Sequence, residues 1–415
     1  MRDAVARITG ARPEEIRAVL WSFAYFFCLL AGYYILRPLR DEMGVAGGVK
    51  NLQWLFTATF FTMLAAVPLY GVVVARLPRR RFIPVVYRFF AVNLAVFWGL
   101  LALGWETAWV ARAFFVWLSV FSLFAVSVFW SFMADLYTTE QGKRLFGFIA
   151  AGGSAGALAG PALTVQLVAW VGPHHLLLVS LVLLEAAVFC ARRLEFRETA
   201  APPSVGGGPF AGLGAVLRSP YLAGIALWVA LLSIAGTFLY FQQAEIVRNA
   251  SDDPAVRTRM FATIDLAVGV LTILVQFVAT GRLITRFGVG PAAALLPLVF
   301  AVGFGVLAAM PALAVVVAFQ ALQRTANFAI SNPAREILFT AVSREEKYKA
   351  KNVIDGVVFR GADAVGGWLF TGLRSLGLSS PALSMAAIPL AAGWLVLALA
   401  LGRAQASRAV TVPKS

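Results

Sequence analysis

The chain has 415 residues, of which 60% are hydrophobic and only 13% are charged. A soluble domain usually carries about 25% charged residues, so this composition suits a lipid bilayer better than water. The net charge of +15 would suit a nucleic-acid partner if it were gathered on one arm or helix. The basic residues are instead scattered in short loops between apolar runs, which excludes a nucleic-acid arm and is typical of membrane topology.

Twelve apolar segments follow one another along the chain, each of roughly the 20 residues that a helix needs to cross a bilayer. They are residues 19–36, 52–75, 82–105, 113–134, 145–171, 174–191, 221–244, 260–281, 287–310, 311–333, 353–373 and 380–402. We therefore predict an all-α polytopic membrane protein with twelve transmembrane helices.

The segments divide into two six-helix halves, residues 1–191 and 221–415, joined by a cytoplasmic linker at 192–220. The linker core, residues 200–209, reads AAPPSVGGGP, a composition typical of flexible connections. The halves also echo each other, because Gly71 is followed five residues later by Arg76, and Gly281 by Arg286. Internal repeats of this kind build many secondary transporters.

Lys and Arg placement indicates the orientation. With the N-terminus in the cytoplasm, the loops on that side carry three times as many Lys and Arg residues as the opposite loops. No apolar stretch with a cleavage site opens the chain, so we expect no removable signal peptide. We expect a multi-pass protein of a bacterial-type inner (plasma) membrane with both termini in the cytoplasm.

A polar stripe marks the predicted tenth helix. Gln320, Arg324, Asn327 and Ser331 fall at i, i+4, i+7 and i+11, on one helical face. Charge inside a bilayer is costly, so this face should line a cavity or meet another helix. The stripe predicts either a cationic site for an anionic substrate or an arginine satisfied by a neighbouring helix.

Aromatic and basic residues gather at the outer end of the first predicted helix. Tyr33 and Tyr34 lie one turn before Arg37, and Arg40 lies one turn after it. Rings and guanidinium groups at this spacing can stack a base and clamp a phosphate, with Trp54 as a further stacking surface. The alternative is an aromatic belt with snorkelling arginines.

Other charges within the spans are candidates for coupling or gating. Asp265 either pairs with a basic residue or carries a coupling proton. Arg360 and Asp363, at i and i+3, either neutralise each other or place Arg360 toward the substrate. Asp355 lies one turn beyond Lys351, which predicts an ion pair at the membrane interface.

Three glycines on the fifth predicted helix, Gly152, Gly156 and Gly160, form a G-x-x-x-G-x-x-x-G pattern, which predicts close helix packing. Cys28 and Cys190 have no C-x-x-C partner, so we predict neither a disulfide nor a metal site. The chain has no phosphate-binding P-loop and no hydrolase or zinc-protease motif, so we predict no cofactor and no enzymatic activity.

The arrangement of the spans resembles the major facilitator superfamily. That family carries a G-x-x-x-D-R-x-G-R-R type signature between its second and third helices. Here the acidic position of the signature is Ala75, and Thr285 in the second half. The resemblance therefore implies the fold but not that acidic gate.

Three stretches resemble a narrower group, the ATP/ADP translocase (NTP/NDP exchange transporter) family. They are residues 36–41 (LRPLRD), 128–146 (VFWSFMADLYTTEQGKRLF) and 349–367 (KAKNVIDGVVFRGADAVGG). The resemblance places Asp135, Glu140, Lys143 and Asp355 at family motif positions, and Arg40 where the family has a Lys.

One position departs from the last of these motifs. Where the family has its second Lys, this chain has Ala364, with Arg360 one turn earlier. Either Arg360 replaces that charge or the substrate has changed.

Taken together, these features predict an alternating-access transporter of an organic anion, of the ATP/ADP exchange type. Its expected partners are a small anionic solute such as ATP or ADP and the lipid bilayer, and we expect a monomer. Two alternatives stay open. One is a proton-coupled symporter or efflux carrier in which Asp265 or Asp363 titrates, and the other is a non-transporting receptor or scaffold.

Overall fold

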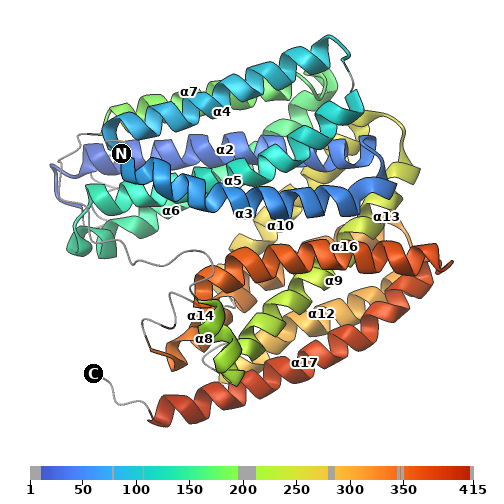
Figure 1. Cartoon of the computed structure of the whole chain (residues 1–415). Helices are drawn as coiled ribbons and strands as arrows, with labels where there is room; N and C mark the ends of the chain where they lie inside the picture. The colour runs from blue at the N-terminus through green and yellow to red at the C-terminus, as the bar shows by residue number, and fades with distance from the viewer. Residues whose placement is uncertain are drawn as a thin grey trace. The chain divides into compact units, whose positions relative to one another are not determined.

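The computed structural model describes residues 11–76, 79–105, 107–194, 212–278, 286–343, 346 and 350–411. Within these ranges every regular element is a helix (Figure 1). The first part of the chain forms α2 (Ile16–Ala46), η1 (Val49–Asn51), α3 (Leu52–Arg76), α4 (Arg79–Ala102), α5 (Thr107–Leu136), α6 (Thr139–Val171) and α7 (Leu176–Arg192). The second part forms α8 (Leu213–Arg218), α9 (Pro220–Ala250), α10 (Pro254–Val278), α12 (Val289–Ala309), α13 (Leu313–Ala326), η2 (Asn327–Ser331), α14 (Asn332–Leu338), η3 (Phe339–Ala341), η4 (Val353–Val358), α16 (Phe359–Ser375) and α17 (Ser380–Thr411).

In the described part of the chain, nine helices are long and apolar enough to cross a bilayer. The other three predicted spans coincide with α3, α7 and the pair η4 and α16. The prediction of an all-α polytopic membrane protein is confirmed, whereas the count of twelve stays a prediction.

The first helix is longer than the sequence predicts. We expected it to end at Leu36, but α2 continues to Ala46 with Pro38 inside it. Proline weakens a helix because it lacks an N–H donor, but one such loss does not end a long, buried helix. The arginines that we placed at the end of the helix therefore lie within it.

Two predicted spans contain π-helical turns, which the sequence did not indicate. The predicted tenth span divides into α13, η2 and α14, and the predicted eleventh begins as η4. A π turn widens the helix and is frequently found at functional sites. The spacing that we assigned to the tenth span therefore holds as far as Asn327, where η2 begins, and does not extend to Ser331.

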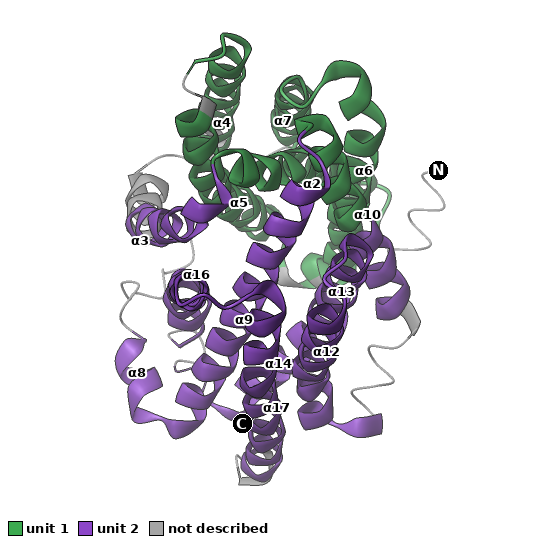
Figure 2. Ribbon diagram, turned by 90° about the vertical axis from the view of Figure 1, so that its right-hand side faces the viewer, with its two compact units in different colours: residues 1–47, 69–205, 253–266 green, residues 48–68, 206–252, 267–415 purple. Residues whose placement is uncertain are grey.

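The chain forms two compact units (Figure 2). Unit 1 comprises residues 1–47, 69–205 and 253–266, and unit 2 comprises residues 48–68, 206–252 and 267–415. The units divide α3 and α10, so they do not coincide with the predicted halves, and the division into halves and linker stays a prediction. The short helix α8 lies within the predicted linker, and residues 195–211 are outside the described part.

The helix contacts of unit 1 have counterparts in unit 2. In unit 1, α2 packs against α5, α6 and α7, and α4 packs against α5 and α7. In unit 2, α9 packs against α13, α16 and α17, and α12 packs against α13 and α17. An internal repeat predicts this correspondence. The loop echo from Gly71 to Arg76 falls on side chains outside the described set, as do residues 281–285 of its counterpart.

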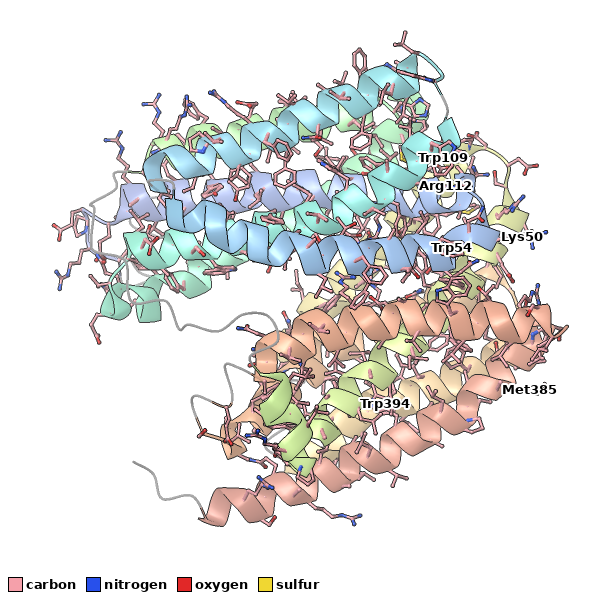
Figure 3. The ribbon with its side chains drawn as sticks, in the orientation of Figure 1. Lys50, Trp54, Trp109, Arg112, Met385 and Trp394 are labelled. Carbon is pink, nitrogen blue, oxygen red and sulfur yellow. The ribbon has the colours of Figure 1, made fainter. Side chains whose placement is uncertain are left out.

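Two tyrosine side chains in the core of unit 1 are hydrogen-bonded across helices. The Tyr25 hydroxyl on α2 donates to the Tyr87 hydroxyl on α4 at 2.8 Å, which donates to the Ala125 carbonyl on α5 at 3.1 Å. At the far end of α2, Arg112 donates to the carbonyl of Gly47 and stacks on Trp109 (Figure 3). Buried polar groups need such partners because no water reaches them.

The glycine pattern on α6 brings two backbones into direct contact, as predicted. A Cβ atom at Gly152 would lie 2.5 Å from the Phe23 carbonyl oxygen on α2, and one at Gly160 would lie 2.7 Å from the Ala31 carbonyl oxygen. Gly156 faces the Phe27 carbonyl in the same way. Only residues without a side chain allow α6 to approach α2 this closely.

We predict that Gly156→Ala destabilises the protein by about 1–3 kcal/mol, because its Cβ would force α6 away from α2. Gly147→Ala is the matched control, since a Cβ at Gly147 meets no atom within 4 Å. Thermal unfolding in detergent should show a lower Tm for Gly156→Ala only. Equal Tm values for both variants would show that the close contact is not needed.

Candidate functional site

Arg37 of α2 lies between an aromatic ring and a carboxylate. Its Nη1 atom is 3.6 Å from Oδ1 of Asp265 on α10, and the Asp265 side chain is only 3% exposed. The guanidinium carbon also lies 5.8 Å from the centre of the Tyr34 ring. Of the two sequence interpretations of Asp265, the structure therefore bears out the pairing with a basic residue.

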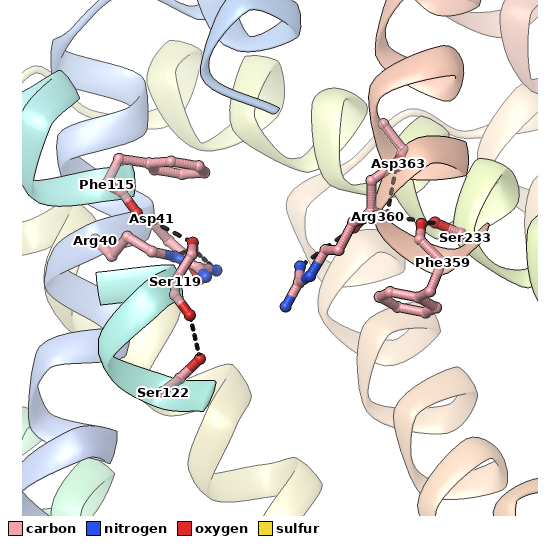
Figure 4. Close-up of polar contacts among 10 residues, drawn as sticks. Arg40, Asp41, Phe115, Ser119, Ser122, Ser233, Phe359, Arg360 and Asp363 are labelled. Carbon is pink, nitrogen blue, oxygen red and sulfur yellow. Dashed lines mark hydrogen bonds and ion pairs between the residues drawn. The ribbon is translucent and has the colours of Figure 1, made fainter. Parts of the chain in front are cut away.

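Arg40 lies one turn further along α2. Its Nη2 and Nε atoms donate to Oδ1 of Asp41 at 2.7 and 3.1 Å, and its guanidinium carbon lies 5.0 Å from the centre of the Phe115 ring (Figure 4). The aromatic ring that contacts Arg40 is therefore that of Phe115 on α5, and not one of the tyrosine rings of α2. Tyr33 instead packs edge-on against Tyr34, with ring centres 5.2 Å apart.

A second ion pair joins α2 to α10, and the sequence did not reveal it. Arg257 Nη2 lies 2.7 Å from Glu42 Oε1, and the two side chains are only 9% and 6% exposed. Arg257 precedes the predicted eighth span, which starts at residue 260, so the sequence predicts that it lies in an outer loop. In the structure, α10 begins at Pro254 and therefore includes Arg257. The charged run from Arg40 to Glu42 was the sequence feature that could have indicated a buried ion pair here. Both ion pairs lie within unit 1.

In unit 2, Arg360 belongs to a network of four side chains. Arg360 Nη1 donates to Oδ2 of Asp363 at 3.3 Å, which confirms the predicted i, i+3 pair. The α9 hydroxyl of Ser233 (labelled in Figure 4) donates to Oδ1 of Asp363 at 2.5 Å. The hydroxyl of Thr237, also on α9, donates to the same oxygen at 3.3 Å. The sequence did not predict these two partners. The network leaves the Arg360 side chain 29% exposed.

The polar stripe of the tenth span is partly a hydrogen-bonded chain. Gln323 Nε2 donates to Gln320 Oε1 at 2.7 Å, and Gln320 Nε2 donates to Oε1 of Gln243 on α9. Arg324 lies one position after Gln323 and is half-buried, and Asn327 opens the π turn η2. The structure thus joins Gln320 to α9, a contact that the stripe alone could not specify.

Trp54 lies in unit 2, whereas Tyr33 and Tyr34 lie in unit 1. Its ring packs edge-on against Trp368, with centres 4.7 Å apart. Trp54 itself, labelled in Figure 3, is 57% exposed. Trp368 donates to Thr57 at 3.0 Å. Trp54 therefore belongs to an exposed aromatic pair, which weakens its case as a substrate-stacking surface.

The motif at residues 128–146 spans the turn from α5 to α6. Thr138 caps α6, and Gln141 returns the bond in a capping box that the sequence analysis missed. Glu140 is exposed in the first turn of α6, where a negative charge favours the helix dipole. Asp135 is half-buried near the end of α5, and the Lys143 side chain lies outside the described set.

Glu15, just before α2, binds the start of α6. It accepts hydrogen bonds from Gln141 at 2.9 Å and Arg144 at 3.2 Å. Burial alone would raise the pKa of Glu15, but the bonds from the Arg12 amide, Gln141 and Arg144 outweigh it and hold the pKa below its ordinary value of 4.5. The carboxylate therefore stays ionised at neutral pH and ties α2 to α6.

The predicted pairing of Asp355 with Lys351 is wrong. Asp355, in η4, lies 3.1 Å from Arg335 on α14, whereas Lys351 binds Glu336 at 2.6 Å. The prediction assumed a regular helix from Lys351 onward, but η4 is π-helical and places Asp355 toward α14.

The comparisons with known proteins agree with this architecture. No protein-family model matches the chain. ADP,ATP carrier protein 1 of Chlamydia trachomatis serovar D is 23% identical over 94% of this chain and 89% of its own length. The protein of the same name from Chlamydia muridarum is 21% identical over the same shares.

Solved structures share the fold. A mutant form of the nucleoside transporter NupG superposes with a TM-score of 0.68 at 13% identity, covering 94% of this chain and 99% of that one. A bacterial homologue of the iron transporter ferroportin gives a TM-score of 0.64 at 13% identity, covering 95% and 98%. The chain is thus a multi-pass membrane protein with the fold of major-facilitator-type transporters. In sequence it resembles the ADP,ATP carriers.

We predict that Glu42→Gln lowers stability by about 3–5 kcal/mol, because it removes the buried carboxylate that the Arg257 guanidinium contacts at 2.7 Å. Glu336→Gln is the matched control, since the Glu336–Lys351 pair is much more exposed and should contribute less than about 1 kcal/mol. Thermal unfolding of both variants in detergent checks the difference. A Glu42→Gln variant as stable as the control would contradict the buried pair.

Proposed function

We propose that the protein is an alternating-access carrier that exchanges nucleotides of the ATP/ADP type across the membrane. The observation that carries the proposal is the environment of Arg37, which is held between the Tyr34 ring and the Asp265 carboxylate. A guanidinium binds phosphate as readily as carboxylate, with the same planar donor geometry. The similarity to ADP,ATP carriers over nearly the whole chain favours nucleotide as the anion.

The pairing of Arg37 offers a physical basis for exchange. A carboxylate and a phosphate repel each other, so in this scheme an arriving phosphate competes with Asp265 for Arg37, displaces it and loosens α10 from α2. Departure of the phosphate leaves Arg37 without a counter-ion, and the Asp265 pair forms again. In this scheme the empty carrier is held by its own carboxylate, and a new anion is needed before the next movement.

In unit 1, Arg40 lies one turn beyond Arg37 on α2 and is assigned to the same phosphate in this proposal. In unit 2, Arg324 and Arg360 are assigned to anion binding within that unit. Arg360 replaces the Lys that the family motif has where this chain has Ala364. Asp363 then serves to fix the Arg360 side chain rather than to bind substrate.

The setting of the carrier is part of the same proposal. The excess of basic residues on one side favours cytoplasmic termini in an inner, plasma-type membrane, with a single chain as the functional unit. A transport role needs no bond making, and the proposal assigns none.

The first prediction concerns Arg37. Purified protein in liposomes loaded with ADP should take up labelled ATP, and uptake should need the internal nucleotide and ignore a pH gradient. Arg37→Gln should slow uptake about tenfold or more, because a charge-assisted contact to phosphate is lost. Arg112→Gln is the control, since Arg112 only caps the end of α2.

The results separate the alternatives. Uptake that follows the pH gradient would replace exchange by proton coupling. Binding of nucleotide without any flux would indicate a receptor or scaffold.

The second prediction concerns Asp265. Asp265→Asn should allow ATP to enter liposomes that contain no nucleotide, because the empty carrier loses the ion pair that holds it. Glu245→Gln removes a carboxylate from a more exposed pair with Arg374 and should leave uptake strictly dependent on internal ADP. Asp265→Asn protein that still requires internal ADP would refute the displacement scheme.

A further inference from the structure

Helix α9 carries an aromatic ring and a carboxamide on one face. Tyr240 and Gln243 are three residues apart, so they lie on successive turns of the same side. Gln243 is buried and Tyr240 is half-buried. Neither residue was singled out by the sequence, because both lie within a long apolar run.

The carboxamides form a directed chain. Gln323 donates to Gln320, and Gln320 donates to the oxygen of Gln243. The oxygen and the nitrogen of the Gln320 carboxamide are therefore both hydrogen-bonded. The series of three carboxamides ends with the amide nitrogen of Gln243, which is the donor offered to a ligand. Three buried carboxamides in a membrane segment are costly, and polar groups in such positions usually serve a ligand or a helix contact.

A second aromatic ring lies beside Tyr240. Phe56 of α3 packs against Tyr240 with ring centres 5.5 Å apart, and both residues are half-buried. Aromatic side chains stack on the flat face of any nucleic-acid base, and a carboxamide beside the ring reads the base edge. The amide nitrogen of a glutamine can in this way donate to N7, an acceptor that both purines carry.

The same helix also reaches the proposed phosphate side. Thr237 of α9 donates to Asp363, which holds Arg360. Thr237 and Gln243 are six residues apart, or about 9 Å along the helix axis. A nucleotide separates its base from its phosphates by a distance of this order, so α9 offers a matching pair of contacts.

We propose that Tyr240, Gln243 and Gln320, with Phe56, form a subsite for the purine base of the transported nucleotide, with Arg360 on the phosphate side. This inference rests on the proposed exchange of nucleotides and adds the part of the substrate that gives selectivity. The competing explanation is that the carboxamides only join α9 to α13.

The neighbouring Gln242 provides a matched control. It is as deeply buried as Gln243, but its oxygen accepts a hydrogen bond from Ser384 on α17 at 2.6 Å. Gln242→Leu and Gln243→Leu therefore remove the same group from adjacent positions of one helix. Each substitution also removes one buried hydrogen bond to a neighbouring helix.

The experiment measures competition by unlabelled ATP, GTP, UTP and inorganic triphosphate against labelled ATP uptake into ADP-loaded liposomes. Wild-type protein should prefer purine nucleotides. Gln243→Leu should reduce the preference for ATP over UTP about tenfold, while inhibition by triphosphate stays unchanged. Gln242→Leu should keep the wild-type preference. Tyr240→Leu, which removes no buried carboxamide, should raise the KM for every nucleotide without altering inhibition by triphosphate.

The failures are distinguishable. If wild-type protein exchanges no nucleotide, both the proposed function and the base subsite are refuted. If wild-type protein exchanges nucleotides but Gln243→Leu and Tyr240→Leu keep its base preference and KM, the exchange stands and the base subsite is refuted. If Gln242→Leu loses the preference as well, the effect comes from helix packing and the subsite is also refuted.

Discussion

A charge buried in hydrocarbon has no water to stabilise it, so it must find its counter-charge within the protein. The charged residues inside this chain follow that constraint. Arg37 meets Asp265, Arg257 meets Glu42, and Arg360 meets Asp363. The first two pairs join α2 to α10, and all three remove a cost that no lipid contact could remove.

The same constraint connects stability to transport. A buried arginine is stable with a carboxylate or with a phosphate, but not with neither. In the proposed exchange, a substrate phosphate takes the place of an internal carboxylate without exposing an unpaired charge. In this view the ion pairs of the empty carrier and the contacts of the loaded carrier are alternative ways to satisfy the same guanidinium groups.

The fold could be predicted from the sequence because membrane helices are encoded locally, in runs of apolar residues between charged loops. The Arg360–Asp363 pair was predictable for the same reason, since its members are three residues apart on one helix. The pairs Arg37–Asp265 and Glu42–Arg257 were not, because they join helices that are distant in sequence.

Local reasoning also failed where the helix was irregular or the signal was weak. Asp355 was assigned the wrong partner because the π turn of η4 rotates it away from the expected face. Gln243 went unnoticed because a single carboxamide barely alters an apolar run.

The glycines of α6 have a mechanical consequence. Their backbone meets the carbonyls of α2 at three successive turns with no side chain between, so no rotamer change can absorb a displacement of one helix against the other. We therefore expect α2 and α6 to move as one rigid body. The start of α6, where Gln141 and Arg144 bind Glu15, and the part of α2 that carries Arg37 and Arg40 should then move together.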